Sequence, residues 1–106
     1  METLNKVELK GIVGNSTEIV IEDERIIRFS VATSYAYKDE RGMPVIDTTW
    51  HSCTAWCGKC PAAAIISKGM MVHLTGRLQV RKGISTEGIE YSQTEIIVNS
   101  LEIVNA

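Results

Sequence analysis

The chain has 106 residues, 44% of them hydrophobic and 23% charged, with a formal net charge of −2. This length allows one domain with a single modest core, and bulk charge does not indicate a polyanionic partner. Because no apolar run could cross a bilayer and Met1–Lys6 lacks the pattern of a secretory signal, we expect a cytoplasmic protein with no membrane partner.

The first long strand is predicted between Lys6 and Gly14, where side chains alternate between apolar and polar. Its inward residues are Val7, Leu9 and Val13. Two glycines in this stretch indicate a bend or bulge. Asn15–Glu24 reads as a polar connection, with a strand extension at Ile19–Ile21.

A second strand is predicted from Arg25 to Tyr37, with Phe29 and Val31 facing the core. The charged stretch that follows, Lys38–Pro44, contains a glycine and ends on a proline, which is typical of a turn. The pattern therefore predicts a hairpin with aromatic side chains near its base.

The third strand, Thr48–Cys57, carries both tryptophans of the chain. One face holds Thr48, Trp50, Ser52, Thr54 and Trp56, and the other holds His51, Cys53, Ala55 and Cys57. Because Cys and Ala are easily buried, we expect the tryptophan face to point outward and His51 to lie at the core rim or in a subunit contact. The two indoles would lie roughly 20 Å apart, a spacing that suits stacked bases of single-stranded nucleic acid. The opposite orientation, with the tryptophans in the core, remains open.

The rest of the chain predicts a short helix and two more strands. Lys59–Lys68 is the helix candidate, with a proline near its start and Gly69 at its end. Met70–Arg81 reads as a strand and Tyr91–Val104 as the last one. The inward residues expected in the fourth strand are Val72, Leu74, Leu78 and Val80.

This order of elements is typical of an all-β, five-stranded OB-fold barrel with one short helix between strands 3 and 4. Such barrels bind oligonucleotides around their second and third strands, and the tryptophan strand is the third. We therefore expect residues 1–106 to form a single OB-fold nucleic-acid-binding domain.

Six short motifs resemble the OB domain of bacterial single-stranded DNA-binding proteins over nearly the whole length. They are Asn5–Asn15, Phe29–Ser34, Thr49–His51, Gly58–Lys59, Lys68–Gly69 with Thr75–Leu78, and Thr94–Asn99. The resemblance implies sequence-independent binding of single-stranded DNA in replication, recombination or repair. It also implies no catalysis, no cofactor, and assembly as a homo-oligomer, either a tetramer or a dimer.

The resemblance and the strand pattern together predict the DNA-binding residues. Base-stacking positions of the family fall on Trp50, Trp56 and Tyr37, and its basic positions on Lys6, Arg81 and Lys82. Arg28 and Arg77 are added because of their places on the second and fourth strands. Ser52, on the tryptophan face, stands where the family commonly has Arg.

Some family features are missing from the sequence. Gly83 stands where another stacking Trp is frequent, and one lost platform would weaken binding about tenfold or more. The chain stops at Val104-Asn-Ala106, without the family's glycine-rich linker and acidic tip. The resemblance therefore gives only doubtful support for repair partners that bind through the tail. A specialised or primosome-type accessory protein remains an alternative.

Two further alternatives come from other classes. Cys57-Gly-Lys-Cys60 has the Cys-x-x-Cys spacing of thiol-disulfide oxidoreductases, but the parallel βαβ context of that family is absent. A zinc site is not expected, since His51, Cys53 and Cys57 are spread along one strand. We expect structural thiols, with Cys60 the candidate for exposure. An OB-fold protein-interaction module is the remaining alternative.

Overall fold

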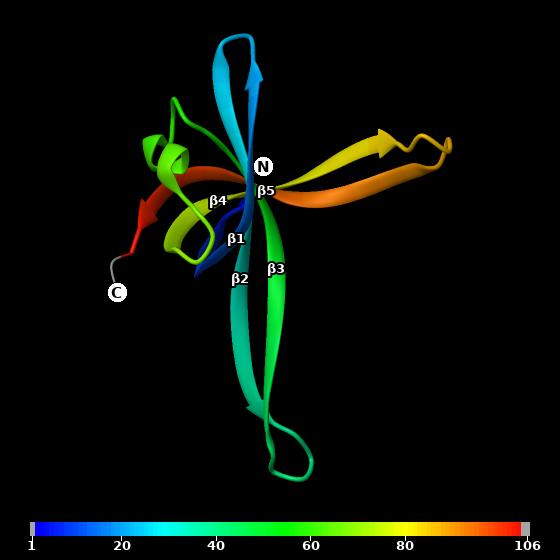
Figure 1. Ribbon diagram of the computed structural model, residues 1–106. Helices are drawn as coiled ribbons and strands as arrows, with labels where there is room; N and C mark the ends of the chain where they lie inside the picture. The colour runs from blue at the N-terminus through cyan, green and yellow to red at the C-terminus, as the bar shows by residue number, and fades with distance from the viewer. Residues whose placement is uncertain (1, 105–106) are drawn as a thin grey trace.

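The computed structural model describes residues 2–104 and consists almost entirely of β-strands (Figure 1). The strands are β1 (Val7–Ile21), β2 (Glu24–Lys38), β3 (Pro44–Trp56), β4 (Met71–Ile84) and β5 (Glu90–Ile103), and a short 3₁₀ helix, η1, spans Pro61–Ile65. Met1, Asn105 and Ala106 belong to the terminal segments considered above and lie outside the described residues.

The strands close a barrel in the order β1-β2-β3-β5-β4, which confirms the predicted five-stranded barrel. Neighbouring strands pair antiparallel except at the closure, where β3 and β5 run parallel. That closure is short and joins Cys53 to Ile96 and Thr54 to Ile97. Because β3 and β5 pair with each other over this short stretch, the rest of each strand can extend away from the barrel.

The barrel interior is filled by alternate side chains of the strands. Its most buried members are Val13, Val31, Cys53, Ala55, Val72, Leu74 and Val98. The aromatic ring of Phe29 joins them, as the alternation of the second strand predicts. His51 is half-buried at the rim, with its Nε2 2.8 Å from Thr33 Oγ1, which agrees with the predicted rim position.

Hairpins project from the barrel in different directions (Figure 1). The β1–β2 hairpin turns at Glu22 and Asp23, both with positive φ. The segment Asn15–Glu24, predicted as a connection, is instead mostly strand, because Ser16–Ile21 pairs with Glu24–Phe29 of β2. The β2–β3 and β4–β5 hairpins form two further arms, and the molecule extends over 54 × 40 × 38 Å.

The predicted helix lies where expected, between β3 and β4, but it is shorter than predicted and of the 3₁₀ type. Pro61 opens it without a backbone donor, the preceding residue gives it no side-chain cap, and Ile66 already has an extended backbone. Ala63 and Ile66 are buried against the barrel end. The segment therefore acts as a small plug.

The prediction that Leu78 and Val80 face the core is wrong. Both lie on the same side of β4 as buried Leu74, but they are 47% and 55% exposed. The pairing of β1 with β4 ends at Gly76, so from Arg77 onward β4 is paired with β5 and no longer with β1, and both side chains lose cover. Among residues 2–104, no helix is long and apolar enough to span a membrane.

Candidate nucleic-acid interface

Trp50 is an open aromatic platform on the outside of the barrel. It is 60% exposed, whereas Cys53 and Ala55 on the other face of β3 are 2% and 0% exposed. The predicted orientation of the strand is therefore confirmed. Small residues leave room for the indole: its cross-strand partner on β2 is Ala32, and its ring lies over Gly14 of β1.

The tryptophan face is not uniformly open. Thr54, predicted to point outward, does so but is only 5% exposed, because Glu95 of β5 covers it. The Thr54 hydroxyl donates a hydrogen bond of 3.1 Å to Glu95 Oε2. Trp56 is half-buried. The face is thus divided into two regions, one around Trp56 and one around Ser52 and Trp50.

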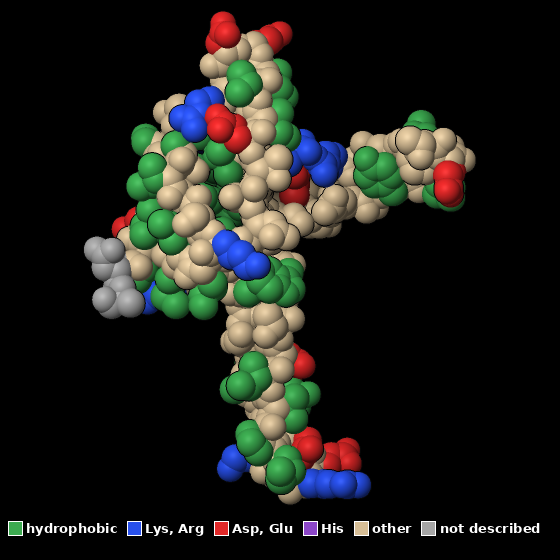
Figure 2. Space-filling model, viewed as in Figure 1, with side chains coloured by type: hydrophobic (Ala, Val, Ile, Leu, Met, Phe, Trp, Pro, Cys, Tyr) green, Lys and Arg blue, Asp and Glu red, His purple; other side chains and the backbone are tan. Residues whose placement is uncertain are grey.

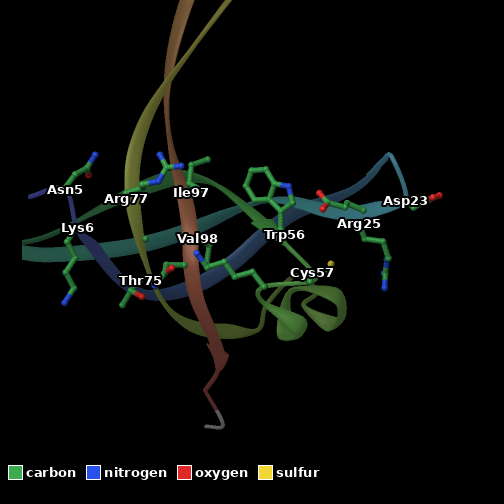
Figure 3. A pocket seen from close by; sticks show the side chains of 15 residues that line it. Asn5, Lys6, Asp23, Arg25, Trp56, Cys57, Thr75, Arg77, Ile97 and Val98 are labelled. Atoms are coloured by element: carbon green, nitrogen blue, oxygen red, sulfur yellow. The ribbon is translucent and has the colours of Figure 1, made fainter.

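The region around Trp56 is a groove of about 1040 Å³ (Figure 3). In this view it runs from Lys6 past Arg77 and Ile97 to the Trp56 indole. The positively charged residues that line it are Lys6, Arg25, Lys59 and Arg77. Arg25 pairs with Glu18, which raises the pKa of the guanidinium and lowers that of the carboxyl. The lining also includes Asp23 and Glu24, so the groove combines one flat aromatic ring with a border of both charges in which basic side chains are in excess.

A second groove, of about 270 Å³, lies on the other side of the Thr54–Glu95 contact and includes Arg28, Ser52 and Arg81. Side chains from three strands are linked there. Arg81 Nη2 donates to Gln93 Oε1 at 3.3 Å, and Gln93 Nε2 donates to Ser52 Oγ at 3.3 Å. Figure 2 shows Lys and Arg side chains in the angle between the β1–β2 and β4–β5 hairpins. This chain of hydrogen bonds joins the outer face of β3 to the β4–β5 hairpin.

Two predicted site residues lie apart from these grooves. Tyr37 pairs with Val45 on the β2–β3 arm, on the opposite face of that ribbon from Trp50, and its ring stacks on Tyr35 at 6.1 Å between centroids. Lys82 lies on the opposite face of the β4–β5 hairpin from Arg81, since the two are neighbours along β4. The structure therefore brings Lys6, Arg77 and Trp56 together, and separately Arg28, Ser52 and Arg81 beside Trp50.

The sequence analysis missed Tyr91, which is cross-strand from Gly83. Its ring occupies the space that a side chain at Gly83 would fill: a Cβ there would lie 2.6 Å from Tyr91 Cζ. A signal was available in the sequence, because glycine opposite an aromatic residue in a hairpin is a familiar pairing. The register needed to see it could not be derived from the turn alone.

The cysteines are placed differently from the prediction for Cys60. Cys60 is buried at 2% exposure, and burial raises the pKa of its thiol; Cys57 is the partly exposed one and lines the Trp56 groove. Burial also raises the pKa of Cys53 to about 12. The Cys57–Cys60 pair is followed by a five-residue 3₁₀ helix and an antiparallel strand, not by the long helix and parallel strand of thiol-disulfide oxidoreductases, so the geometry gives the oxidoreductase alternative no support. Within residues 2–104, no three His, Cys, Asp or Glu side chains form a metal-binding group.

Comparisons with known proteins agree with this geometry. A family model described as the single-strand binding protein family matches residues 4–104. A single-stranded DNA-binding protein of Neisseria meningitidis serogroup A is 35% identical over 105 residues, covering 96% of this chain and 60% of that protein. Single-stranded DNA-binding protein 1 of Chlorobaculum tepidum is 33% identical over 108 residues, covering 97% of this chain and 66% of that protein.

The chain thus spans 60% and 66% of the lengths of these curated relatives. Among solved structures, one described as a Plasmodium falciparum SSB complex with ssDNA superposes with a TM-score of 0.85 at 23% identity. The match covers 99% of this chain and 98% of that one. At this identity the likeness shows that the fold is shared.

Proposed function

Because the chain belongs to the single-strand binding protein family, we propose that it binds single-stranded DNA without sequence preference through the outer face of β3. The observation that carries the proposal is Trp50. A tryptophan that is 60% exposed, backed by protein on one side and bordered by the Arg28–Arg81 groove, offers one aromatic face to a base.

Binding divides between charges and rings. The cationic side chains at Lys6, Arg28, Arg77 and Arg81 contact phosphates and release counterions, which makes affinity fall with salt. Trp50 and Trp56 stack on bases, and stacking tolerates any sequence because every base has a π-face. Tyr37 contacts a different stretch of the strand, since it lies on the other face of the β2–β3 ribbon. None of these roles requires catalysis or a cofactor.

We also propose that the chain acts as a homo-oligomer, either a tetramer or a dimer, in DNA replication, recombination or repair. An apolar pair on the outside of the barrel supports the oligomer: Ile12 and Met71, cross-strand neighbours on β1 and β4, are 46% and 38% exposed. Covering such a pair with a second copy removes apolar surface from water. Light scattering of the free protein measures the oligomeric state.

The direct test of the function is an anisotropy titration with fluorescein-labelled oligo(dT) of about 16 nucleotides, the upper range for one OB fold. We expect tight binding at low salt, and log K that falls linearly with log[salt]. A duplex of the same length should compete poorly, because paired bases cannot stack on the indoles. Folded protein that fails to bind at low salt would contradict the proposal and favour a protein-interaction module.

A further inference from the structure

The β4–β5 hairpin carries an aromatic residue whose position is determined by a glycine. Gly83 and Tyr91 are paired across the two strands, and the end of the tyrosine ring lies on the Gly83 backbone. Any Cβ at position 83 would meet ring atoms at 2.6 to 3.0 Å, so the arrangement requires glycine. The ring is supported on one side while the residue stays 48% exposed.

Strand register places this ring on the same surface as Trp50. The pairs Arg81–Gln93 and Gly83–Tyr91 are two positions apart, so their side chains share one face of the hairpin. Gln93 is in turn hydrogen-bonded to Ser52, which lies two positions from Trp50 on the outer face of β3. An uninterrupted surface therefore runs from Trp50 past Ser52, Gln93 and Arg81 to Tyr91.

We propose that Tyr91 is a base-stacking platform for single-stranded DNA, following Trp50 along this surface. The inference rests on the function proposed above and extends it to the β4–β5 hairpin. The ligand group is a nucleobase of either ring size, because stacking on an aromatic ring tolerates any base. Arg81, on the same face and two positions away, contacts the phosphate between the two platforms.

The support from Gly83 gives the platform a physical advantage. A ring resting on backbone has fewer conformations to lose when a base stacks on it, so less binding free energy is lost to ordering. Tyr35 and Tyr37 differ in this respect, because they stack on each other.

The test compares variants of Tyr91 and Gly83 in oligo(dT) titrations at low salt. Tyr91→Ala and Tyr91→Leu should each weaken binding about fivefold to a hundredfold, the range for one lost base stack, whereas Tyr91→Phe should stay within about twofold of wild type. Gly83→Ala should also weaken binding, because its methyl group displaces the ring. Combined with Tyr91→Ala it should add no further loss. The matched control is Ile84→Ala, an exposed residue on the opposite face of the same hairpin.

Oligonucleotide length separates a binding role from a structural one. The loss should be large with oligo(dT) of about 16 nucleotides and smaller with about four, which can bind on Trp50 and the barrel without occupying the hairpin, whereas a purely structural role of Tyr91 would give equal losses at both lengths. Equal losses for Tyr91→Phe and Tyr91→Leu, or wild-type affinity for Tyr91→Ala on the long oligonucleotide, would overturn the inference while wild-type binding still supports the proposed function. Failure of the wild-type protein to bind would instead overturn the function itself.

Discussion

The indole of Trp50 packs on the backbone of Gly14, two strands away across β2. A Cβ at position 14 would lie 2.5 Å from Trp50 Cζ3 and 2.6 Å from Ser30 Oγ, so only glycine leaves room for the ring. The exposed platform of β3 is thus supported from β1, at the point where the β1–β2 pairing shifts register between Val13 and Ser16.

Gly14→Ala should therefore weaken oligo(dT) binding by displacing the indole. We expect a loss of up to about 1–3 kcal/mol, the contribution of one base stack, measured by anisotropy at low salt. The matched comparison is a double-mutant cycle with Trp50→Ala. If the two losses add fully, Gly14 does not act through Trp50.

Arg81 should contribute to the salt dependence of binding. Each phosphate neutralised on a single strand changes the slope of log K against log[salt] by about 0.7, so Arg81→Ala should make the slope shallower by roughly that amount. Lys10→Ala is the control, since Lys10 lies on β1, pairs with His73 of β4 and is away from both grooves. A slope that is unchanged in the Arg81 variant would place that guanidinium outside the phosphate path.

Cys57 should react with a thiol reagent before the other two cysteines. Cys53 and Cys60 are buried and their thiol pKa values are raised by that burial, whereas Cys57 is partly exposed in the Trp56 groove. A maleimide at neutral pH should therefore label Cys57 first, as read by peptide mass spectrometry, and bound oligo(dT) should slow this labelling. In urea all three should react at similar rates. Labelling of Cys60 as fast as Cys57 in the folded protein would contradict the burial shown here.

His73 should make stability depend on pH. Its Nε2 lies 2.7 Å from Glu8 Oε2 and its Nδ1 3.4 Å from Glu102 Oε1, with Lys10 opposite on β1. The hydrogen bond to Glu8, more than that to Glu102, raises the pKa of His73 above its ordinary value. The stabilisation is therefore complete below that ordinary value, about 6.5, and is lost as pH rises through the folded-state value.

The measurement is the urea midpoint from about pH 6 to about pH 9 for wild type and His73→Gln. The wild-type midpoint should fall relative to the variant as pH rises, by a small amount because the groups are exposed. Glu8→Gln should reduce the difference. Parallel curves for wild type and His73→Gln would rule out this contribution.

The order of the elements was enough to predict the barrel, and alternation along β3 was enough to predict the open Trp50 face. Small, easily buried Cys53 and Ala55 determined which side of the strand faces inward, and local residue type carries that information. The burial of Thr54 could not be predicted in the same way, because it depends on Glu95, which is 41 positions away. Long-range pairing decided that outcome.

The projecting hairpins set the limit of sequence reasoning. Leu78 and Val80 have the pattern of core residues, but a strand pattern does not show where a strand leaves its barrel. For the same reason Tyr37 and Trp50 could not be assigned to opposite faces without the β2–β3 register, nor Tyr91 placed over Gly83 without that of β4–β5. Which residues share a surface is determined by register and twist, and one-residue differences reverse it.

The most direct measurement uses Trp56→Phe, which leaves Trp50 as the one indole in the chain. Oligo(dT) should quench the emission of this variant at low salt, and added salt should restore it as the complex dissociates. Emission that stays constant while anisotropy shows the oligonucleotide bound to the folded variant would contradict stacking on Trp50, and with it the assignment of the outer face of β3 as the DNA-binding surface.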